Sequence, residues 1–145
     1  MLALAGAGYA AYLEFFKKSE AVVTYQKFAE AVLHGQADAA RGLAQGDAAL
    51  AQVEKAMSDT GAARRMSQLM GSRYAILDEA SSAGRRTIHA EQVVAWDPPG
   101  TTSAMGAVRV HHDHKVVVEK TAQGWKVVSF EDTVTGARDW KGQPL

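Results

Sequence analysis

Hydrophobic residues recur at spacings of three and four between Ser19 and Gly35, which is the pattern of one helix face. Ser19 is a typical N-cap residue, and Gly35 suits the left-handed conformation that often ends a helix. The pattern therefore predicts an amphipathic helix between them. Its apolar face carries Val22, Tyr25, Phe28, Ala29, Val32 and Leu33.

Shorter helices are predicted to follow this first one. One comes after Asp38, and another begins with Asp47 as its N-cap. Residues 62–70 are expected to form one or two further helical turns after the break at Ser58–Gly61. The apolar positions of these segments are Ala39, Ala40, Leu43, Leu50, Val53, Met57, Met66, Leu69 and Met70.

Beyond Gly71 the pattern changes to β-branched and aromatic residues that alternate with polar ones. Turn residues at 81–84, 97–100 and 122–124 separate the runs. We expect an antiparallel meander with one apolar face, which the upstream helices must cover. The predicted strands are residues 74–80, 87–96, 104–120 and 125–132.

The alternation also assigns residues to the faces of two strands. In the second run Ile88, Ala90, Val94 and Trp96 share the apolar face, and Gln92 is the polar exception. In the third run every second residue lies on the same face, and these residues are Val108, Val110, His112, His114, Val116 and Val118.

The N-terminus is unusually apolar, because residues 1–13 contain no charge before Glu14, and Lys17 and Lys18 close the segment. A helix of residues 1–16 would span about 24 Å, short of the roughly 30 Å of a bilayer core. Three interpretations remain: the end of a membrane anchor with the lysines at the membrane surface, a remnant of a secretory signal, or a helix that packs on the domain or another subunit.

Three regions are thus expected: an apolar N-terminal helix at 1–18, one domain at 19–133 and a C-terminal tail at 134–145. The tail is polar apart from Trp140, and either folds back on the domain or acts as a docking segment.

Composition narrows the function classes. The chain has 145 residues, 16 Lys and Arg against 16 Asp and Glu, and no cysteine. A domain of this length buries enough surface to fold without disulfides, and thiol chemistry is excluded. The balanced charge argues against nucleic-acid binding, which usually requires a basic surface. We expect no cofactor.

Several segments resemble the nuclear transport factor 2-like superfamily. They are Phe28-x-x-Ala31-Val32-x-x-Gly35, then Ala39-Ala40 and Leu43, and the closing strand Gly124-Trp125-Lys126-Val127-Val128. The resemblance covers residues 20–132 and implies an α+β cone, with N-terminal helices packed on a curved antiparallel sheet of about four strands. The three predicted helices are more than the plainest members have.

The resemblance leaves function open, because one fold hosts unlike functions. Members similar to ketosteroid isomerase and the polyketide cyclases use acid–base residues inside the cone. Others are noncatalytic binding modules, including envelope domains tethered by an N-terminal helix. The apolar N-terminus makes this chain look most like the tethered members.

The segment His111-His112-Asp113-His114 is the densest group of metal-ligand residue types. His112 and His114 point the same way on a strand, so they could bind zinc if His89 approached from a neighbouring strand as a third ligand. The alternatives are a polar strand midpoint without a ligand, or a pH-sensitive contact.

An acid–base site in the cone would need a carboxylate or histidine inside an apolar cavity. The candidates are His112, His114 and Asp78, with Tyr25 or Tyr74 as hydrogen-bond donors. No catalytic motif of the superfamily can be matched to these residues one by one. A shift of one residue in register would move Asp78 to the outer face.

These observations predict a noncatalytic binding or assembly domain. It would be tethered to the extracytoplasmic face of a bacterial inner membrane through residues 1–16, and would bind a protein partner or its own copies. The alternative is a cytoplasmic small-molecule-binding or cyclase/isomerase-like enzyme. That alternative requires a cavity lined by His112 or His114 and a carboxylate, and not filled by Trp96 and Trp125.

Overall fold

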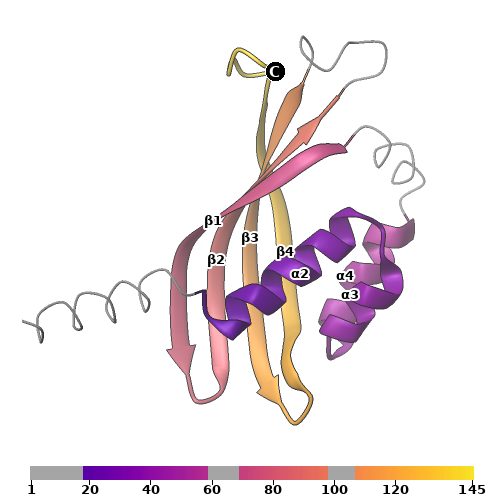
Figure 1. Ribbon diagram of the computed structural model, residues 1–145, viewed down its shortest axis with the longest axis vertical. Coiled ribbons are helices and arrows are strands. Elements are labelled where there is room, and N and C mark those ends of the chain that lie inside the picture. Colours follow the sequence, from indigo (N-terminus) through magenta and orange to yellow (C-terminus); the bar gives the residue numbers. More distant parts are fainter. Residues whose placement is uncertain (1–17, 59–68, 98–106) are drawn as a thin grey trace, which may run out of the picture.

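The computed structural model describes residues 18–58, 69–97 and 107–145. In this part of the chain three helices precede four strands, which form one antiparallel sheet in the order β1-β2-β3-β4. Helix α2 crosses the sheet, and α3 and α4 lie near β4 (Figure 1). The predicted α+β class is confirmed. The elements are α2 (Glu20–Leu33), α3 (Ala37–Leu43), α4 (Asp47–Ser58), β1 (Leu69–Ser82), β2 (Arg85–Trp96), β3 (Val108–Thr121) and β4 (Gly124–Arg138).

Helix α2 begins and ends where the sequence predicts. The Ser19 side chain accepts a hydrogen bond from the Val22 backbone N–H at 3.2 Å, which caps the first turn. The Ser19 hydroxyl also donates to Glu79 on β1 at 2.7 Å, so the start of the helix is fixed to the sheet. Gly35 follows the C-cap with a φ of +65°, a conformation that glycine adopts without strain.

The core lies between α2 and the face of the sheet that we call the inner face. Tyr25 and Phe28 of α2 are fully buried there, and the Phe28 ring meets Phe130 of β4 with centroids 5.2 Å apart. Burying a large apolar side chain stabilises a fold by about 1.5–3 kcal/mol, so these contacts hold the helix on the sheet. The sheet contributes fully buried residues to this core, namely Ile88, Ala90, Val116, Val118 and Val127.

Helix α4 differs from its prediction in two details. Asp47 is the first helical residue and not the N-cap. Leu50 is 36% exposed, whereas Ala49 and Val53 are fully buried. Val53 is thus buried as predicted, whereas Ala49 takes the inward position one turn earlier and Leu50 lies at the edge of the buried face. The α3–α4 connection is held to β4 by a bond of 2.9 Å from Gln45 N–H to the Val127 carbonyl.

The segment between α4 and the sheet corrects another prediction. Residues 59–68 lie outside the described part of the chain, so most of the helical turns expected at 62–70 lie there too. At its end, however, Leu69 and Met70 belong to β1 and not to a helix. The expected turn at 97–100 also lies outside the described residues, except for Asp97.

Strands β1, β2 and β4 are longer than predicted. Strand β3 spans Val108–Thr121, and residues 104–106 of its expected range lie outside the described part of the chain. Bulges interrupt two of the three strand pairs. One residue has no partner at each of four register shifts: Met70 and Leu77 in β1, and Val128 and Thr135 in β4. A bulge bends a strand and increases its twist, and it exchanges the two faces for the residues that follow. The curvature of the sheet and the identity of the inward residues both depend on these positions.

Strand β4 continues to Arg138, beyond the expected domain boundary at Thr133. The last residues turn back, and the Leu145 N–H donates to the Ala137 carbonyl at 3.0 Å. Of the two alternatives for the tail, the folded-back segment is observed. Trp140 nevertheless stays 51% exposed, with the Lys141 ammonium 5.1 Å from its ring centre. Hydrogen bonds of the backbone and of the Arg138 and Asp139 side chains, and not burial of the tryptophan, hold the segment.

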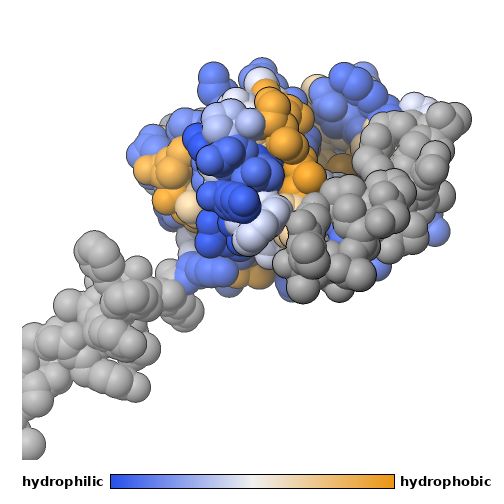
Figure 2. All heavy atoms as spheres, turned by 90° about the horizontal axis from the view of Figure 1, so that it is seen from above, coloured by the Kyte–Doolittle hydropathy of each residue, from blue (hydrophilic) through white to orange (hydrophobic). Residues whose placement is uncertain are grey.

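The N-terminal helix expected at residues 1–18 lies outside the described part of the chain except for Lys18, which is not helical. Within the described ranges, none of the helices has the length and hydrophobicity that crossing a bilayer requires. In the view of Figure 2, hydrophobic side chains lie in separate groups between hydrophilic ones.

Candidate functional site

A pocket of about 420 Å³ opens between α2, α4 and the inner face of the sheet. Its wall is mainly apolar, and its polar lining residues are Gln92, His112, His114 and Asp132. Trp96 lines the pocket without filling it, and Trp125 lies elsewhere, donating to Glu20 at the start of α2. The cone is therefore open. Apolar residues of its wall include Ala29, Val32, Ala56, Val110 and Phe130.

The strand register gathers the polar residues at one place. His114 of β3 lies opposite Asp132 of β4, and His112 lies opposite Gln92 of β2. Directly opposed residues on one face of an antiparallel sheet have their side chains in contact range. Three adjacent strands thus bring these four side chains to one area of the inner face.

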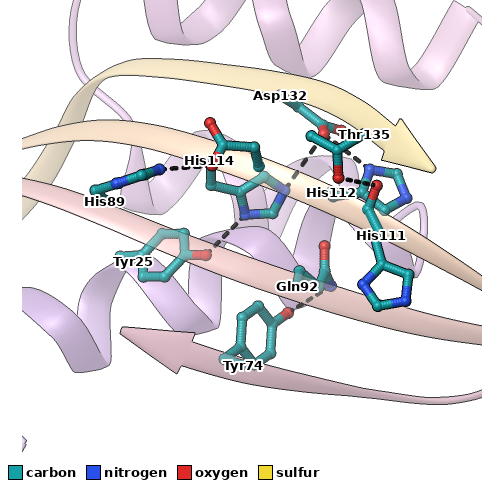
Figure 3. Close-up of polar contacts among 10 residues, drawn as sticks. Tyr25, Tyr74, His89, Gln92, His111, His112, His114, Asp132 and Thr135 are labelled. Atoms are coloured by element: carbon teal, nitrogen blue, oxygen red, sulfur yellow. Dashed lines mark hydrogen bonds and ion pairs between the residues drawn. The ribbon is translucent and has the colours of Figure 1, made fainter. Parts of the chain in front are cut away.

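Asp132 lies between the two imidazoles (Figure 3). Its Oδ1 is 2.8 Å from His112 Nδ1 and 3.5 Å from His114 Nε2. The shorter contact is a hydrogen bond in which the His112 N–H donates to the carboxylate. The longer one is an ion-pair distance at which no hydrogen bond forms.

His114 is held from its other side by α2. The Tyr25 hydroxyl lies 2.7 Å from His114 Nδ1, and both side chains are buried. A proton on Nε2 faces the Asp132 carboxylate, so Nδ1 accepts the hydrogen bond from Tyr25. Among the buried side-chain nitrogens and oxygens of the described residues, His114 Nε2 alone has no hydrogen-bond partner. Such an atom destabilises a fold by about 1–3 kcal/mol.

The charges of the cluster follow from these contacts. Burial raises the pKa of Asp132, but the hydrogen bond from His112 and the interactions with both imidazoles outweigh it and hold that pKa well below its usual range. Burial raises the pKa of Tyr25, and the negative charges of Asp132 and Asp113 raise it further. At neutral pH the site therefore contains a charged carboxylate and a neutral phenol.

A second polar network supports the pocket from the β1 side. The Gln92 side chain donates to the Tyr74 hydroxyl at 2.8 Å, and Tyr74 donates to Glu30 of α2 at 2.7 Å. Ser72 also donates to Glu30. Burial raises the pKa of Tyr74, and the Glu30 carboxylate raises it further. The network fixes the Gln92 amide, whose oxygen points away from Tyr74 (Figure 3).

The structure brings together His112, His114 and Tyr25, three of the residues considered for an acid–base site. It corrects the placement of Asp78. Regular alternation would put Asp78 on the inner face with Tyr74, but the bulge at Leu77 exchanges the faces, and Asp78 lies opposite His89. Glu79 takes the inward position instead, opposite Ile88.

The expected third ligand, His89, is also corrected. It lies opposite Lys115 on the outer face, because it is one residue removed from the inward residues Ile88 and Ala90. There it pairs with Asp113 at 2.5 Å, so it does not approach His112 and His114.

Two site residues, Gln92 and Asp132, do not figure among the candidates taken from the sequence. The sequence does mark Gln92 as unusual, because it is a polar residue at an inward position of an otherwise apolar strand face. Nothing in the sequence marks Asp132 as inward. Regular alternation from the buried Val127 would place Asp132 on the outer face, and only the bulge at Val128 turns it inward. The inward residues of β4 are Val127, Phe130 and Asp132. The first two are three positions apart because of the bulge, and the last two are two positions apart, as in a regular strand.

No protein-family model matches the sequence, and no curated protein is significantly similar to it. Solved structures do match the fold. An NTF2-like protein with a cystatin-like fold from Novosphingobium aromaticivorans is 15% identical, with 89% of each chain covered and a TM-score of 0.62. A ketosteroid isomerase-like protein from Erwinia carotovora atroseptica is 11% identical, with 79% of this chain and 93% of that chain covered and a TM-score of 0.56.

These similarities show the fold. The chain has the nuclear transport factor 2-like, cystatin-like cone, as the sequence resemblance implied. They carry no information on a membrane tether, and at these identities they do not transfer an activity.

The arrangement offers two kinds of chemistry. Held by Asp132 at Nδ1, the His112 ring has its second nitrogen available to exchange a proton or a hydrogen bond with a bound molecule. Alternatively, His112, His114 and Asp132 each offer one ligand atom to a metal ion, and these atoms lie within 4.8 Å of one another.

Proposed function

We propose that this protein is a small-molecule-binding domain and that its ligand occupies the pocket of the cone. The observation that carries the proposal is the pocket itself, about 420 Å³ in volume, with an apolar wall and polar side chains gathered at one place. Small-molecule sites have volumes of roughly 300–1,000 Å³ and this same division between an apolar lining and a few oriented polar groups.

The lining indicates the class of ligand. Apolar side chains such as Val32, Trp96 and Val110 favour a compact hydrophobic body. Gln92 and His112 offer hydrogen bonds to a carbonyl or hydroxyl group at the polar end. A cyclase/isomerase-like activity would add a proton transfer to this binding, for which Asp132 orients His112.

The test is a binding assay with a pocket-blocking variant. The full chain is screened by saturation-transfer NMR against a panel of cyclic ketones, phenols and aromatic carboxylates. Ala56→Trp, on the pocket wall, should abolish the signal of each binder. Ala51→Trp is the matched control, because Ala51 is an exposed residue of the same helix and does not line the pocket. Equal binding by the two variants would refute the proposal, as would a panel without any binder.

A second proposal concerns attachment and does not depend on the pocket. The uncharged residues 1–13, followed by Lys17 and Lys18, favour a domain tethered to the extracytoplasmic face of a bacterial inner membrane. There it would bind a protein partner or its own copies. Fractionation of cells that express the native-length gene product tests this. Recovery of the protein entirely in the soluble cytoplasmic fraction would contradict the tether.

A further inference from the structure

We propose that His112, His114 and Asp132 bind a divalent transition-metal ion, specifically Zn²⁺, at the polar end of the pocket. This inference goes beyond the proposed function, because metal binding by these side chains needs no small-molecule ligand. It rests on the ligand geometry, on an unpartnered buried nitrogen and on the support of one ligand by α2.

The three side chains have the separations that a metal site requires. Zn²⁺ binds nitrogen and oxygen ligands at about 2.0–2.2 Å, so two ligand atoms in a tetrahedral site lie about 3.4 Å apart. Here the Asp132 oxygen is 2.8 Å from one imidazole nitrogen and 3.5 Å from the other, and all three ligand atoms lie within 4.8 Å of one another. The three ligand atoms are therefore close enough to coordinate one ion, and the native strand register already brings them together.

The unpartnered atom points to a ligand. His114 is 1% exposed, and its Nε2 has no hydrogen-bond partner although it faces the Asp132 carboxylate (Figure 3). If the pair served only as a structural ion pair, a shift of about half an ångström would complete the hydrogen bond. A metal ion between the two groups satisfies Nε2 directly and uses the same carboxylate oxygen.

The other side of His114 has the support that metal-binding histidines usually receive. Its Nδ1 lies 2.7 Å from the buried Tyr25 hydroxyl, and this hydrogen bond orients the ring. When Nε2 binds a metal, the proton of the ring moves to Nδ1 and is donated to the Tyr25 oxygen. Outer partners of this kind fix the tautomer and orientation of a ligand.

The ligand set also indicates which metal is bound and where a further ligand enters. Two imidazoles and one carboxylate suit Zn²⁺ better than Ca²⁺ or Mg²⁺, which prefer oxygen. Three protein ligands leave a fourth position free, as in catalytic zinc sites and unlike structural ones. Because His112, His114 and Asp132 all line the pocket, that position is open to a water molecule or to the polar group of a bound ligand.

Calorimetry on the full chain, prepared without a histidine tag and stripped with EDTA, tests the site with Zn²⁺ alone. We expect one Zn²⁺ per chain. Affinity should fall at least about 100-fold in His112→Gln and in Asp132→Asn, and about 10–100-fold in Tyr25→Phe, the range typical of an outer partner. His89→Gln is the matched control, because it removes a histidine–aspartate pair of the outer face and should leave the affinity unchanged.

Cobalt provides a second measurement. Co²⁺ at this site should give the strong visible absorption of a tetrahedral complex, and Asp132→Asn should remove it. Asp132→Asn and Tyr25→Phe keep the shape of the side chain, and far-UV circular dichroism verifies that they are folded. The inference is overturned if the folded wild type binds no Zn²⁺, or if His89→Gln weakens binding as much as His112→Gln. Small-molecule binding measured in the presence of EDTA tests the proposed function separately, because no metal ion is then available to the site.

Discussion

At the scale of single residues, the contact between Tyr25 and His114 links helix α2 to the candidate site. Tyr25→Phe keeps the ring in the core and removes the hydroxyl that His114 Nδ1 uses. A buried acceptor is then left without its partner, so the free energy of unfolding should fall by about 1–3 kcal/mol. Urea denaturation measures this.

A double-mutant cycle with His114→Phe separates the hydrogen bond from ring packing. The two substitutions should couple, because once His114 is replaced the Tyr25 hydroxyl has lost the partner it had in the native protein. Strictly additive effects would contradict the assigned contact.

The Glu30 carboxylate makes stability depend on pH. Burial raises its pKa, but hydrogen bonds from Ser72 and Tyr74 and the charge of His34 outweigh burial, so the pKa is lowered. A lowered folded-state pKa means that the unfolded state binds more protons. The stabilisation is therefore present above the usual glutamate pKa of about 4.3 and is lost as the pH falls through the folded-state value.

Glu30→Gln keeps the hydrogen-bond acceptor and removes the charge. The wild type should be more stable than this variant at pH 7, and the difference should shrink between about pH 5 and pH 3. Thermal denaturation at a series of pH values measures it. A difference that is the same at pH 3 and pH 7 would show that the charge of Glu30 contributes nothing.

The sequence identified some residues of the site and not others for a physical reason. His112 and His114 follow from strict alternation in β3, in which each inward residue lies two positions from the next. Asp132 and Asp78 lie beyond bulges, and a bulge changes the face of every later residue without any marked change in composition. Placing them required the register of the neighbouring strand.

At the scale of the elements, the bulge at Leu77 decides which carboxylate of β1 faces inward. Deletion of Leu77 would remove the bulge and leave Asp78 opposite His89 and Glu79 opposite Ile88, because Leu77 is the residue without a partner. The strand would lose the bend and extra twist that the bulge gives it. Because the helices pack on the curved sheet, we expect the deletion to lower the free energy of unfolding by about 1–3 kcal/mol. The midpoint of thermal unfolding measures it.

Leu77→Thr is the control for this deletion. The Leu77 side chain is 57% exposed, so a polar replacement that keeps the bulge should change stability by no more than about 0.5 kcal/mol. If the deletion and the replacement had similar effects, the bend at this bulge would contribute nothing to the stability of the fold.

At the scale of the whole molecule, the order of elements was predictable and the open pocket was not. The sequence shows helical periodicity first and strand alternation afterwards. Amphipathic helices must bury their apolar faces, and the only apolar surface available to them is one face of the sheet that follows. The pocket depends on which side-chain sizes meet across the cone. Small residues such as Ala29 and Ala56 line the pocket at positions where larger side chains would close it. No local pattern in the sequence shows that these two residues, on different helices, line the same cavity.

An open pocket in so small a domain implies a conflict between stability and binding. Space that holds a ligand is space in which side chains lack packing partners, so filling it should stabilise the fold. Ala56→Leu, which extends into the pocket from α4, should raise the free energy of unfolding by about 0.5–2 kcal/mol and weaken the ligands of the binding assay. Ala51→Leu, on the exposed side of α4, should change neither quantity appreciably. If Ala56→Leu instead destabilised the protein to the extent of an overpacked core, about 1–3 kcal/mol, the pocket would be too narrow for a ligand and the binding proposal would fail with it.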